Sequence, residues 1–348
     1  MRVLWLSPWL RPLARVHADA LRSAGHEVRI VTSDQHPESG PARPDEWVLD
    51  PRPKQPSTYR PFLRVRSEVA AFGAEVVVTE LVRDPRWLTL GRGLPRIDVV
   101  HDDRPHDAAE QRPRWERAVF DRWQSRSDLT IFFSRFVADA VGREPRVVVP
   151  LSSDVADAAV PPFVEADGRR DFVLSGRLND YKNIPVALAA WRLHRSGPHH
   201  RGDRLVLIGD GDVPHDLPEG VRWQRGPFRY ADELTTLARA KGSLVHYRRA
   251  TQSGVQMLAM QLGVMPVVSP EGALPELQPS GGPVVGVDDP RGLADALDTL
   301  ADPHEAVRAG RVARRAYLDR HAQSRVAAAL SDAVAQAAAG RRGRSTAR

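Results

Sequence analysis

The chain contains no cysteine among its 348 residues. Disulfides, thiolate-ligated zinc, iron–sulfur clusters and cysteine nucleophiles are therefore excluded. The sequence also lacks the uninterrupted run of about 18 apolar residues that a membrane-spanning helix needs. The first apolar stretch, residues 3–6, is too short for an export signal. We expect a cytoplasmic protein, with any membrane contact peripheral and at the inner face.

Two common phosphate-binding signatures are absent as well. There is no Gly-x-Gly-x-x-Gly fingerprint and no Walker lysine loop, which argues against nicotinamide and P-loop chemistry. The net charge is +6, but 50 basic residues are interspersed with 44 acidic ones, and no nucleic-acid-binding motif occurs. We therefore expect no nucleic-acid partner. The unbalanced basic residues near the end predict a disordered tail over 340–348.

The pattern that is present alternates short apolar strands with helical segments. Two such series occur, separated by a Pro- and Gly-containing stretch at residues 152–170. This predicts an α/β protein with two Rossmann-like, doubly wound domains. The predicted domains are 1–160 and 161–320, followed by a helix over 321–339 that packs back on the first. The strands are expected at 2–7, 27–32, 75–79, 97–100, 129–133 and 147–151, then at 172–175, 205–208, 221–224, 243–246 and 266–269. Residues 35–62 have little periodicity and predict a long irregular loop.

The most informative motif follows the strand at 172–175. It reads Gly176-Arg-Leu-Asn-Asp-Tyr-Lys-Asn183, so a glycine turn and two cations, Arg177 and Lys182, precede the start of a helix. Cations at the carboxyl end of a parallel strand suit a diphosphate, particularly one that gains charge as a leaving group. The spacing alone also allows a plainer interpretation, in which both are surface cations beside a turn.

Residues 172–183 resemble the start of the second domain of GT-B-fold enzymes in glycosyltransferase family 4, the glycosyl transferases group 1. The same order of motifs continues with Leu205-Val-Leu-Ile-Gly-Asp-Gly-Asp, a turn at Gly226, Gln252-Ser-Gly-Val and Pro266-Val-Val-Ser-Pro-Glu-Gly-Ala-Leu-Pro-Glu276. The resemblance implies two Rossmann-like domains facing a central cleft. It also implies that Arg177 and Lys182 hold the diphosphate of a nucleotide-sugar donor.

A second candidate segment lies before a predicted helix. Thr251, Gln252, Ser253, Gly254 and Val255 place small and polar residues at a helix start, where free backbone N–H groups suit a phosphate or a sugar hydroxyl. A serine or threonine there can equally be a simple helix cap. Most proteins of the resembled family carry two glutamates in this region, with seven residues between them. This chain has Thr251 and Ala259 there, which puts the usual carboxylate contacts to the donor in doubt.

Acidic and histidine candidates follow other strands. Glu276 lies in the loop after 266–269 and is a candidate ribose acceptor, although it and Glu271 could both be plain loop carboxylates. His101 follows the strand at 97–100 and resembles, in position, a family histidine near the donor sugar. Its neutral ring can hydrogen-bond a hydroxyl.

Two residues of the first loop are candidates for the acceptor side. Trp9 and Arg11 stand where the resembled proteins have glycines, and an aromatic ring stacks well on a sugar. Burial of Trp9 in the core is the alternative.

Metal chemistry is not expected. His101, Asp102, Asp103 and His106 cluster in sequence, but nothing distant completes a metal site. Residues 209–212, Gly-Asp-Gly-Asp, lack the spacing of a calcium loop and predict a turn. We expect neither a metal nor a separate cofactor.

The sequence as a whole favours a glycosyltransferase. It would move a sugar from a nucleotide-diphosphate-sugar to a carbohydrate, lipid-linked or small-molecule acceptor, with retention of configuration if it follows the family. His101, Arg177 and Lys182 would act in catalysis. Two alternatives stay open: a non-catalytic protein that binds sugar nucleotides, which would explain the missing glutamates, and a GT-B-type epimerase or hydrolase.

Overall fold

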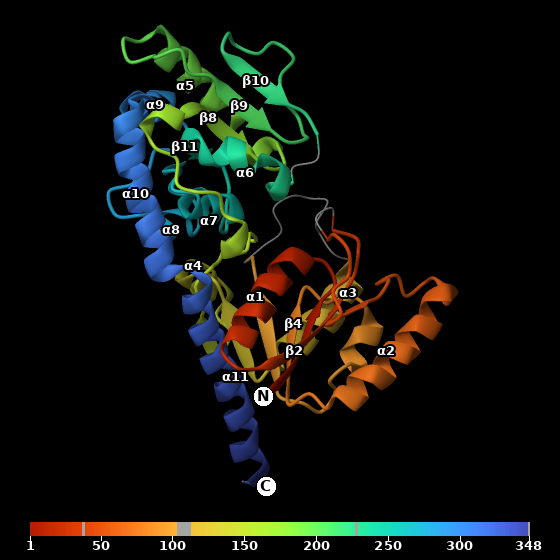
Figure 1. Cartoon of the computed structure of the whole chain (residues 1–348). Helices are drawn as coiled ribbons and strands as arrows, with labels where there is room; N and C mark the ends of the chain where they lie inside the picture. The colour runs from red at the N-terminus through yellow and green to blue at the C-terminus, as the bar shows by residue number, and fades with distance from the viewer. Residues whose placement is uncertain (37–38, 103–112, 227–228, 347–348) are drawn as a thin grey trace. The chain divides into compact units, whose positions relative to one another are not determined.

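The computed structural model describes residues 1–36, 39–102, 113–226 and 229–346. The chain forms two compact units: unit 1 comprises residues 1–150 and 323–348, and unit 2 comprises 151–322 (Figure 1). Unit 2 begins at residue 151, where the sequence suggested 161, because the intervening stretch packs on unit 2. The backbone N–H of Ser153 lies 3.3 Å from Tyr317 Oη, and Gln261 Nε2 donates to the carbonyl of Val155 at 3.0 Å.

Unit 1 contains a seven-stranded sheet in which all neighbouring strands are parallel. Its order is β3-β2-β1-β4-β5-β6-β7. The strands are β1 (Arg2–Ser7), β2 (Glu27–Thr32), β3 (Glu46–Val48), β4 (Val76–Glu80), β5 (Arg96–Val100), β6 (Leu129–Phe132) and β7 (Arg146–Val148). The strand order reverses at β1, which lies between β2 and β4. The prediction of an irregular loop over 35–62 is wrong at two points, because this stretch contains β3 and the first residues of the helix Tyr59–Phe72.

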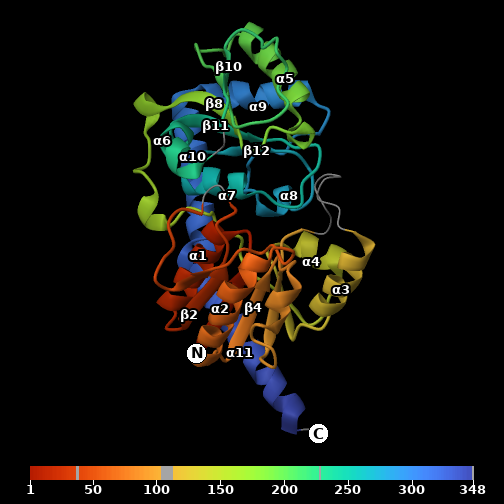
Figure 2. The ribbon, with the colours of Figure 1, turned by 90° about the vertical axis from the view of Figure 1, so that its right-hand side faces the viewer.

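Helices cover both faces of this sheet. They are α1 (Arg11–Ser23), α2 (Tyr59–Phe72), α3 (Arg114–Gln124), α4 (Arg135–Val141) and α11 (Gln323–Thr346). Leu4 and Leu6 of β1 pack with Phe62 of α2 on one face, whereas Trp5 contacts His17 of α1 on the other. The helix α11 packs on α1 and on β4, β5 and β6 (Figure 2). It continues to Thr346, so the disordered tail expected from residue 340 is helical up to that residue.

Unit 2 is built in the same way around five parallel strands in the order β10-β9-β8-β11-β12. The strands are β8 (Arg170–Ser175), β9 (Leu205–Ile208), β10 (Val221–Gln224), β11 (Ala240–Val245) and β12 (Pro266–Val268). The helices are α5 (Ile184–Ser196), α6 (Tyr230–Ala238), α7 (Gly254–Gln261), α8 (Leu274–Leu277), α9 (Pro290–Ala301) and α10 (Pro303–Arg320). Short 3₁₀ turns occur in both units. Those of unit 1 are Pro56–Thr58 and Pro85–Thr89, and those of unit 2 are Asp157–Ala159, Ala166–Gly168 and Asp180–Lys182.

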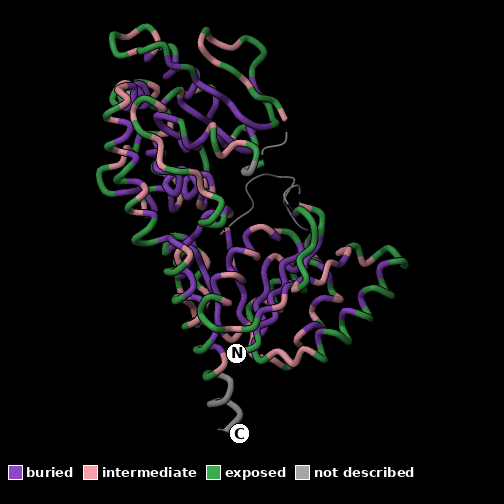
Figure 3. Tube along the Cα trace, viewed as in Figure 1, coloured by how far each residue is buried: buried purple, intermediate pink, exposed green. Residues whose placement is uncertain are grey.

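Successive side chains of β8 point to opposite faces of the sheet and contribute to the core of unit 2 on both sides. Val173 packs on one face with Leu258 of α7, and Phe172 contacts His194 of α5 on the other. The central strands β1, β4, β9 and β11 are largely buried, whereas the edge strands β7 and β10 are partly exposed (Figure 3). Within the described residues, no helix combines the length and the apolar character needed to cross a bilayer. The predicted fold class, two Rossmann-like α/β domains, is confirmed.

Candidate functional site

The sheet of unit 2 brings the two predicted donor segments to one edge. The strand order reverses at β8, which lies between β9 and β11. Residues 176–183 follow the carboxyl end of β8, and residues 246–254 follow that of β11. Ligands of open α/β sheets bind at such a reversal, outside the carboxyl ends of the strands. Arg177, Lys182 and the segment 251–255 therefore share the position where this topology collects ligands.

Backbone packing shapes the first loop. Gly176 has a φ of +107°, and a Cβ on Gly209 would lie 2.0 Å from the carbonyl oxygen of Gly176. Gly211 is equally constrained, because its Cβ would lie 2.3 Å from the carbonyl of Leu178. The 209–212 segment is thus a turn, as predicted, and it forms a β-bridge to Leu178. Glycines are required here because two backbones touch.

Lys182 lies beneath this loop. It is only 3% exposed, and its Nζ donates to the carbonyl of Ser175 at 2.9 Å and to Tyr247 Oη at 2.7 Å. The ammonium also lies 4.1 Å from the centre of the Tyr247 ring. Burial, and then the positive charge of Arg177, lower the pKa of Lys182 to about 7. The interpretation of Lys182 as a surface cation is therefore wrong, whereas Arg177 is exposed.

Three buried polar atoms of the segments that follow β8 and β11 have no hydrogen-bond partner among the described residues. They are Ser175 Oγ, at the end of β8, Asn183 Oδ1, just before α5, and Gln252 Oε1, in the second segment. Buried polar groups in folded proteins are nearly always paired, so each such atom calls for an explanation. Of the three, Gln252 Oε1 belongs to the segment that the sequence predicts to contact the donor.

The second segment combines a cap with buried positions. Ser253 is the N-cap of α7, and its Oγ accepts a hydrogen bond from the backbone of Gln256 at 3.3 Å, so the simple cap interpretation holds for this residue. Tyr247 Oη lies 3.4 Å from the same Oγ, which connects this cap to Lys182. Thr251 is buried, Gly254 is the first residue of α7, and Val255 is 8% exposed.

Ala259 occupies the second of the two positions where the resembled family carries glutamate. It is 6% exposed and belongs to the apolar core of unit 2, together with Leu258 and Leu262. A carboxylate would be costly in that environment without a partner. The departure from the family pattern is therefore compatible with the packing around it.

The loop after β12 is joined to the second segment. A Cβ on Gly272, whose φ is +56°, would lie 2.1 Å from the carbonyl of Ala250, and the backbone N–H of Ala273 donates to Thr251 at 2.8 Å. Glu276 follows in α8 and is partly exposed, as is Glu271. The structure thus places Glu276 near this edge of the sheet without distinguishing it from Glu271.

His101 belongs to unit 1 and directly follows β5. It is 8% exposed, and its Nε2 lies 2.6 Å from Glu80 Oε1 at the end of β4. Glu80 Oε2 accepts from the indole Nε1 of Trp5 at 3.3 Å. Burial alone would raise the pKa of Glu80, but the hydrogen bond and charge of His101, with smaller contributions from His17 and Ser7, together outweigh burial and lower that pKa below its usual value. The ring of Phe133 packs 5.1 Å from that of His101.

The two predicted acceptor-side residues are placed differently. Trp9 is 45% exposed and contacts His36 edge-on at 5.7 Å, so the alternative of a core tryptophan is wrong. Arg11 is buried, and its Nε and Nη2 donate to Glu46 Oε2 at 3.0 and 2.6 Å. The guanidinium of Arg11 is thus bound to Glu46, and this ion pair joins α1 to β3 within unit 1.

Sequence reasoning missed two residues of these clusters. The predicted strand 75–79 stops one residue before Glu80, although Glu80 ends a strand next to the one that precedes His101. Tyr247 follows β11 and contacts Lys182 across 65 residues of sequence. Polar residues at the carboxyl ends of adjacent predicted strands were the available signal for both.

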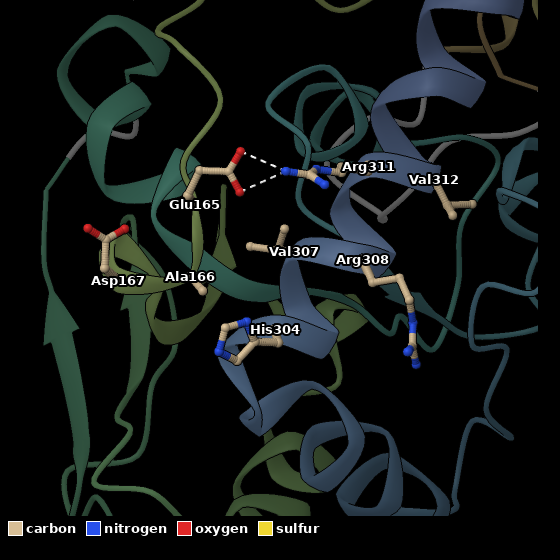
Figure 4. Close-up of a pocket in the computed structure, with 8 residues that line it drawn as sticks. All are labelled: Glu165, Ala166, Asp167, His304, Val307, Arg308, Arg311 and Val312. Atoms are coloured by element: carbon tan, nitrogen blue, oxygen red, sulfur yellow. Dashed lines mark hydrogen bonds and ion pairs between the residues drawn. The ribbon is translucent and has the colours of Figure 1, made fainter.

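A metal site is not apparent in the described part of the chain, where no three His, Asp or Glu side chains gather as ligands. Asp103 and His106 lie outside the described residues. Unit 2 also has an open cavity of about 840 Å³, where Glu165 accepts from Arg311 at 2.8 and 3.0 Å (Figure 4). Its lining consists of Glu165, Ala166, Asp167, His304, Val307, Arg308, Arg311 and Val312, none of them a predicted site residue.

Solved structures confirm the architecture. Sucrose-phosphate synthase from Thermosynechococcus elongatus aligns with a TM-score of 0.72 and 18% identity, over 95% of this chain and 98% of that one. HepE from Anabaena, in complex with UDP, gives 0.68 and 15% over 96% and 100%. The trehalose-6-phosphate protein from E. coli, bound with UDP-2-fluoro glucose, gives 0.65 and 15% over 96% and 99%. At these identities the likeness establishes the GT-B fold.

Family models add the class of protein. Residues 14–154 match the model described as Glycosyltransferase Family 4, and residues 169–302 match the model described as Glycosyl transferases group 1. No curated protein matches the sequence significantly. The two models fall on successive parts of the chain, one largely within unit 1 and one within unit 2. The chain therefore belongs to the GT-B glycosyltransferases of the family 4 and group 1 type.

Proposed function

We propose that this glycosyltransferase uses a nucleoside-diphosphate-sugar as donor and transfers the sugar, with retention of configuration, to a carbohydrate, lipid-linked or small-molecule acceptor. The observation that carries the donor assignment is the burial of the Lys182 ammonium group without an anionic hydrogen-bond partner among the described residues. A lysine that is 3% exposed, with two neutral hydrogen-bond acceptors, at the strand-order reversal of a parallel sheet is suited to an anionic ligand. HepE and the E. coli protein were solved with UDP and a UDP-sugar, which supports the same donor class.

The proposal assigns roles by position. Arg177 and Lys182 bind the diphosphate, and the start of α7 at Ser253 and Gly254 offers backbone N–H groups to the donor. The unpaired Gln252 Oε1 accepts a hydroxyl of the ribose or sugar. His101 hydrogen-bonds the transferred sugar. Each of these groups belongs to a segment that follows a parallel strand, and ligands of such sheets bind beyond the carboxyl ends of the strands, which supports the assignment.

The transfer step needs no carboxylate nucleophile. The bond between the anomeric carbon and the diphosphate oxygen breaks, and its electron pair stays on that oxygen. The acceptor hydroxyl attacks the same face of the anomeric carbon, and its proton passes to a diphosphate oxygen. Negative charge therefore grows on the diphosphate in the transition state, where Arg177 and Lys182 stabilise it more than in the bound donor.

A thermal-shift screen over UDP, GDP, ADP and dTDP and their common sugars tests the donor class. A ligand that binds only the native state raises the melting temperature according to its affinity and concentration. The best donor is then incubated with a panel of simple and phosphorylated sugars, and anomeric configuration is read by NMR. Selective stabilisation with acceptor-dependent transfer supports the proposal. Donor hydrolysis or epimerisation without an acceptor, or no binding at all, would contradict it.

A further inference from the structure

Tyr247 connects the two predicted donor segments of unit 2. It lies in the segment after β11, and its Oη is 2.7 Å from Lys182 Nζ and 3.4 Å from the Oγ of Ser253, the N-cap of α7. Lys182 and Tyr247 are each 3% exposed, and Ser253 is 6% exposed. The loop after β8 and the start of α7 therefore meet at one buried hydroxyl.

Packing within unit 2 fixes the position of this hydroxyl. The backbone N–H of Tyr247 donates to Ser269 Oγ at 3.0 Å, and the Ser269 hydroxyl donates to the carbonyl of Tyr247 at 2.7 Å. The ring of Tyr181 packs edge-on against that of Tyr247 at 5.7 Å. The other residues packed with Tyr247 are apolar: Val245, Val255, Val268 and Leu274. The fold thus holds the tyrosine in place without a ligand.

The ammonium of Lys182 is confined between Tyr247 and the loop after β8. Its Nζ donates to the carbonyl of Ser175 at 2.9 Å. A Cβ on Gly176, whose φ is +107°, would lie 3.0 Å from this Nζ, so a side chain at position 176 would displace the ammonium. An ammonium has three hydrogens, and among the described residues two of them have an acceptor. The third is therefore left for a ligand.

The chemistry of the two groups fixes the direction of their hydrogen bond. A charged ammonium only donates, so Tyr247 Oη accepts from Lys182, and its own hydrogen is left for Ser253 Oγ. Burial raises the pKa of the Tyr247 hydroxyl, so the hydroxyl stays neutral. Its oxygen stabilises the charged form of Lys182 without cancelling the charge. The positive charge is held in place and still needs an anion.

We infer that Tyr247 is a positioning residue of the donor site, whose hydroxyl holds the Lys182 ammonium between the carboxyl end of β8 and the start of α7. The nature of the ligand, a nucleoside diphosphate, rests on the proposed function, whereas the hold on Lys182 is a property of unit 2 alone. Removal of the hydroxyl should make the charged form of Lys182 less stable, both in the free protein and in the complex.

The first test observes the Lys182 ammonium directly. The chain has only three lysines, Lys54, Lys182 and Lys241, so protein labelled with ¹³C-lysine gives a simple spectrum, in which Lys182→Met assigns the Lys182 signal. Titration of its ¹³Cε shift measures the pKa, which should be about 7 in the parent. In Tyr247→Phe this pKa should fall by about one pH unit or more, because one charged hydrogen bond is lost while the ring remains. An unchanged titration would overturn the inference.

The second test compares diphosphate affinity at two pH values. The probe is the tightest binder among UDP, GDP, ADP and dTDP, measured by calorimetry. At pH 8 free Lys182 is largely neutral, so only the complex loses the hydrogen bond, and Tyr247→Phe should bind about tenfold more weakly than the parent. At pH 6 free Lys182 is largely protonated and loses the bond in both states, so the difference should shrink to about twofold.

The ratio of the two affinities at one pH isolates the hydroxyl. The other charged and titratable groups that act on the pair are Arg177, which lowers the pKa of Lys182, and Tyr181, whose ring lies 5.5 Å from Nζ. Both are the same in the parent and in Tyr247→Phe, as is the diphosphate, so their own titration cancels. A loss by the same factor at both pH values would show that Tyr247 only supports the loop, and would overturn the inference.

Tyr317→Phe is the matched control. It removes another buried tyrosine hydroxyl of unit 2, which lies 3.3 Å from both Ser152 Oγ and the backbone nitrogen of Ser153. Neither the Lys182 titration nor diphosphate affinity should change.

Two further outcomes remain decisive. If Tyr247→Phe does not fold, the parent still tests the contact, because the Lys182 methylene next to Nζ should show a nuclear Overhauser effect to the Tyr247 ring, 4.1 Å from Nζ. Its absence would overturn the inference. If the parent binds none of the diphosphates, the proposed function fails, and the Lys182 titration alone then decides whether Tyr247 holds the ammonium.

Discussion

A buried ionisable side chain lies at the carboxyl edge of each sheet, Glu80 in unit 1 and Lys182 in unit 2. The two differ in how far neighbouring groups compensate their charge. In unit 1, Glu80 has a histidine and an indole N–H as partners, so its charge is satisfied without any ligand. In unit 2, Lys182 donates to two neutral oxygens, and burial lowers its pKa to about 7. The edge of unit 1 is therefore preassembled, whereas that of unit 2 gains most from binding an anion.

The two edges suit two different steps of sugar transfer, orientation of the sugar and stabilisation of the diphosphate. A preassembled edge holds a side chain in one geometry, which suits orientation of the transferred sugar. An edge with an incompletely compensated cation gains free energy when a diphosphate arrives, and more as negative charge grows on it. Variants at the two edges should therefore give different patterns of affinity and turnover.

The largest effects are expected at Arg177 and Lys182. Arg177→Ala and Lys182→Met should each weaken nucleoside diphosphate binding about 10- to 100-fold, since a charged hydrogen bond is worth roughly 1.5–3 kcal/mol. Turnover with saturating donor should fall further, because the contact strengthens in the transition state. Calorimetry and initial rates provide the two measurements.

Arg204→Ala is the matched control for these cations. Arg204 is an exposed arginine of unit 2 that pairs with Asp171 and precedes β9, at the amino end of that strand. Its removal should change neither binding nor turnover. Parent-like behaviour of folded Arg177 and Lys182 variants would place the diphosphate elsewhere.

A smaller effect of a different kind is expected in unit 1. His101→Ala should lower turnover on the order of tenfold, by loss of one hydrogen bond to the sugar, while nucleoside diphosphate affinity stays at the parent value. The product diphosphate lacks the sugar, so its affinity should not depend on the histidine. Equal losses in diphosphate affinity and in turnover would remove the contrast between the two edges.

The third prediction concerns protons taken up on binding. With a pKa of about 7, Lys182 is largely neutral at pH 8 in the free protein and largely protonated at pH 6. A bound diphosphate favours the charged form, so binding should take up about 0.9 proton at pH 8 and about 0.1 at pH 6. Calorimetry in buffers of different ionisation enthalpy measures this uptake.

Lys182→Met is the control for the proton measurement, because it removes the titrating group. The pH-dependent part of the uptake should then disappear. An uptake at pH 8 that survives in Lys182→Met would assign the proton to another group, including the diphosphate itself.

The sequence predicted most strands, since parallel strands buried on both faces appear as short apolar runs. β1, β2, β9 and β10 have the predicted bounds. β3 was missed because three residues, Glu46–Val48, show no periodicity, and only pairing with β2 reveals it. The burial of Lys182 could not be read from its spacing, because it depends on Tyr247 far along the chain. The contact between Glu80 and His101 likewise requires the pairing of β4 with β5.

The smallest expected effect compares two equivalent helix caps. Ser134 caps α4 in unit 1 and Ser253 caps α7 in unit 2, accepting from the backbone of Val137 at 3.2 Å and of Gln256 at 3.3 Å. Each serine-to-alanine change should cost about 1 kcal/mol of stability, measured by thermal or denaturant unfolding. Only Ser253→Ala should also weaken nucleoside diphosphate binding, because its helix start is the proposed donor contact. If both variants lose stability but bind the diphosphate like the parent, Ser253 is a cap alone, and the donor contacts of this loop reduce to its backbone and to Gln252.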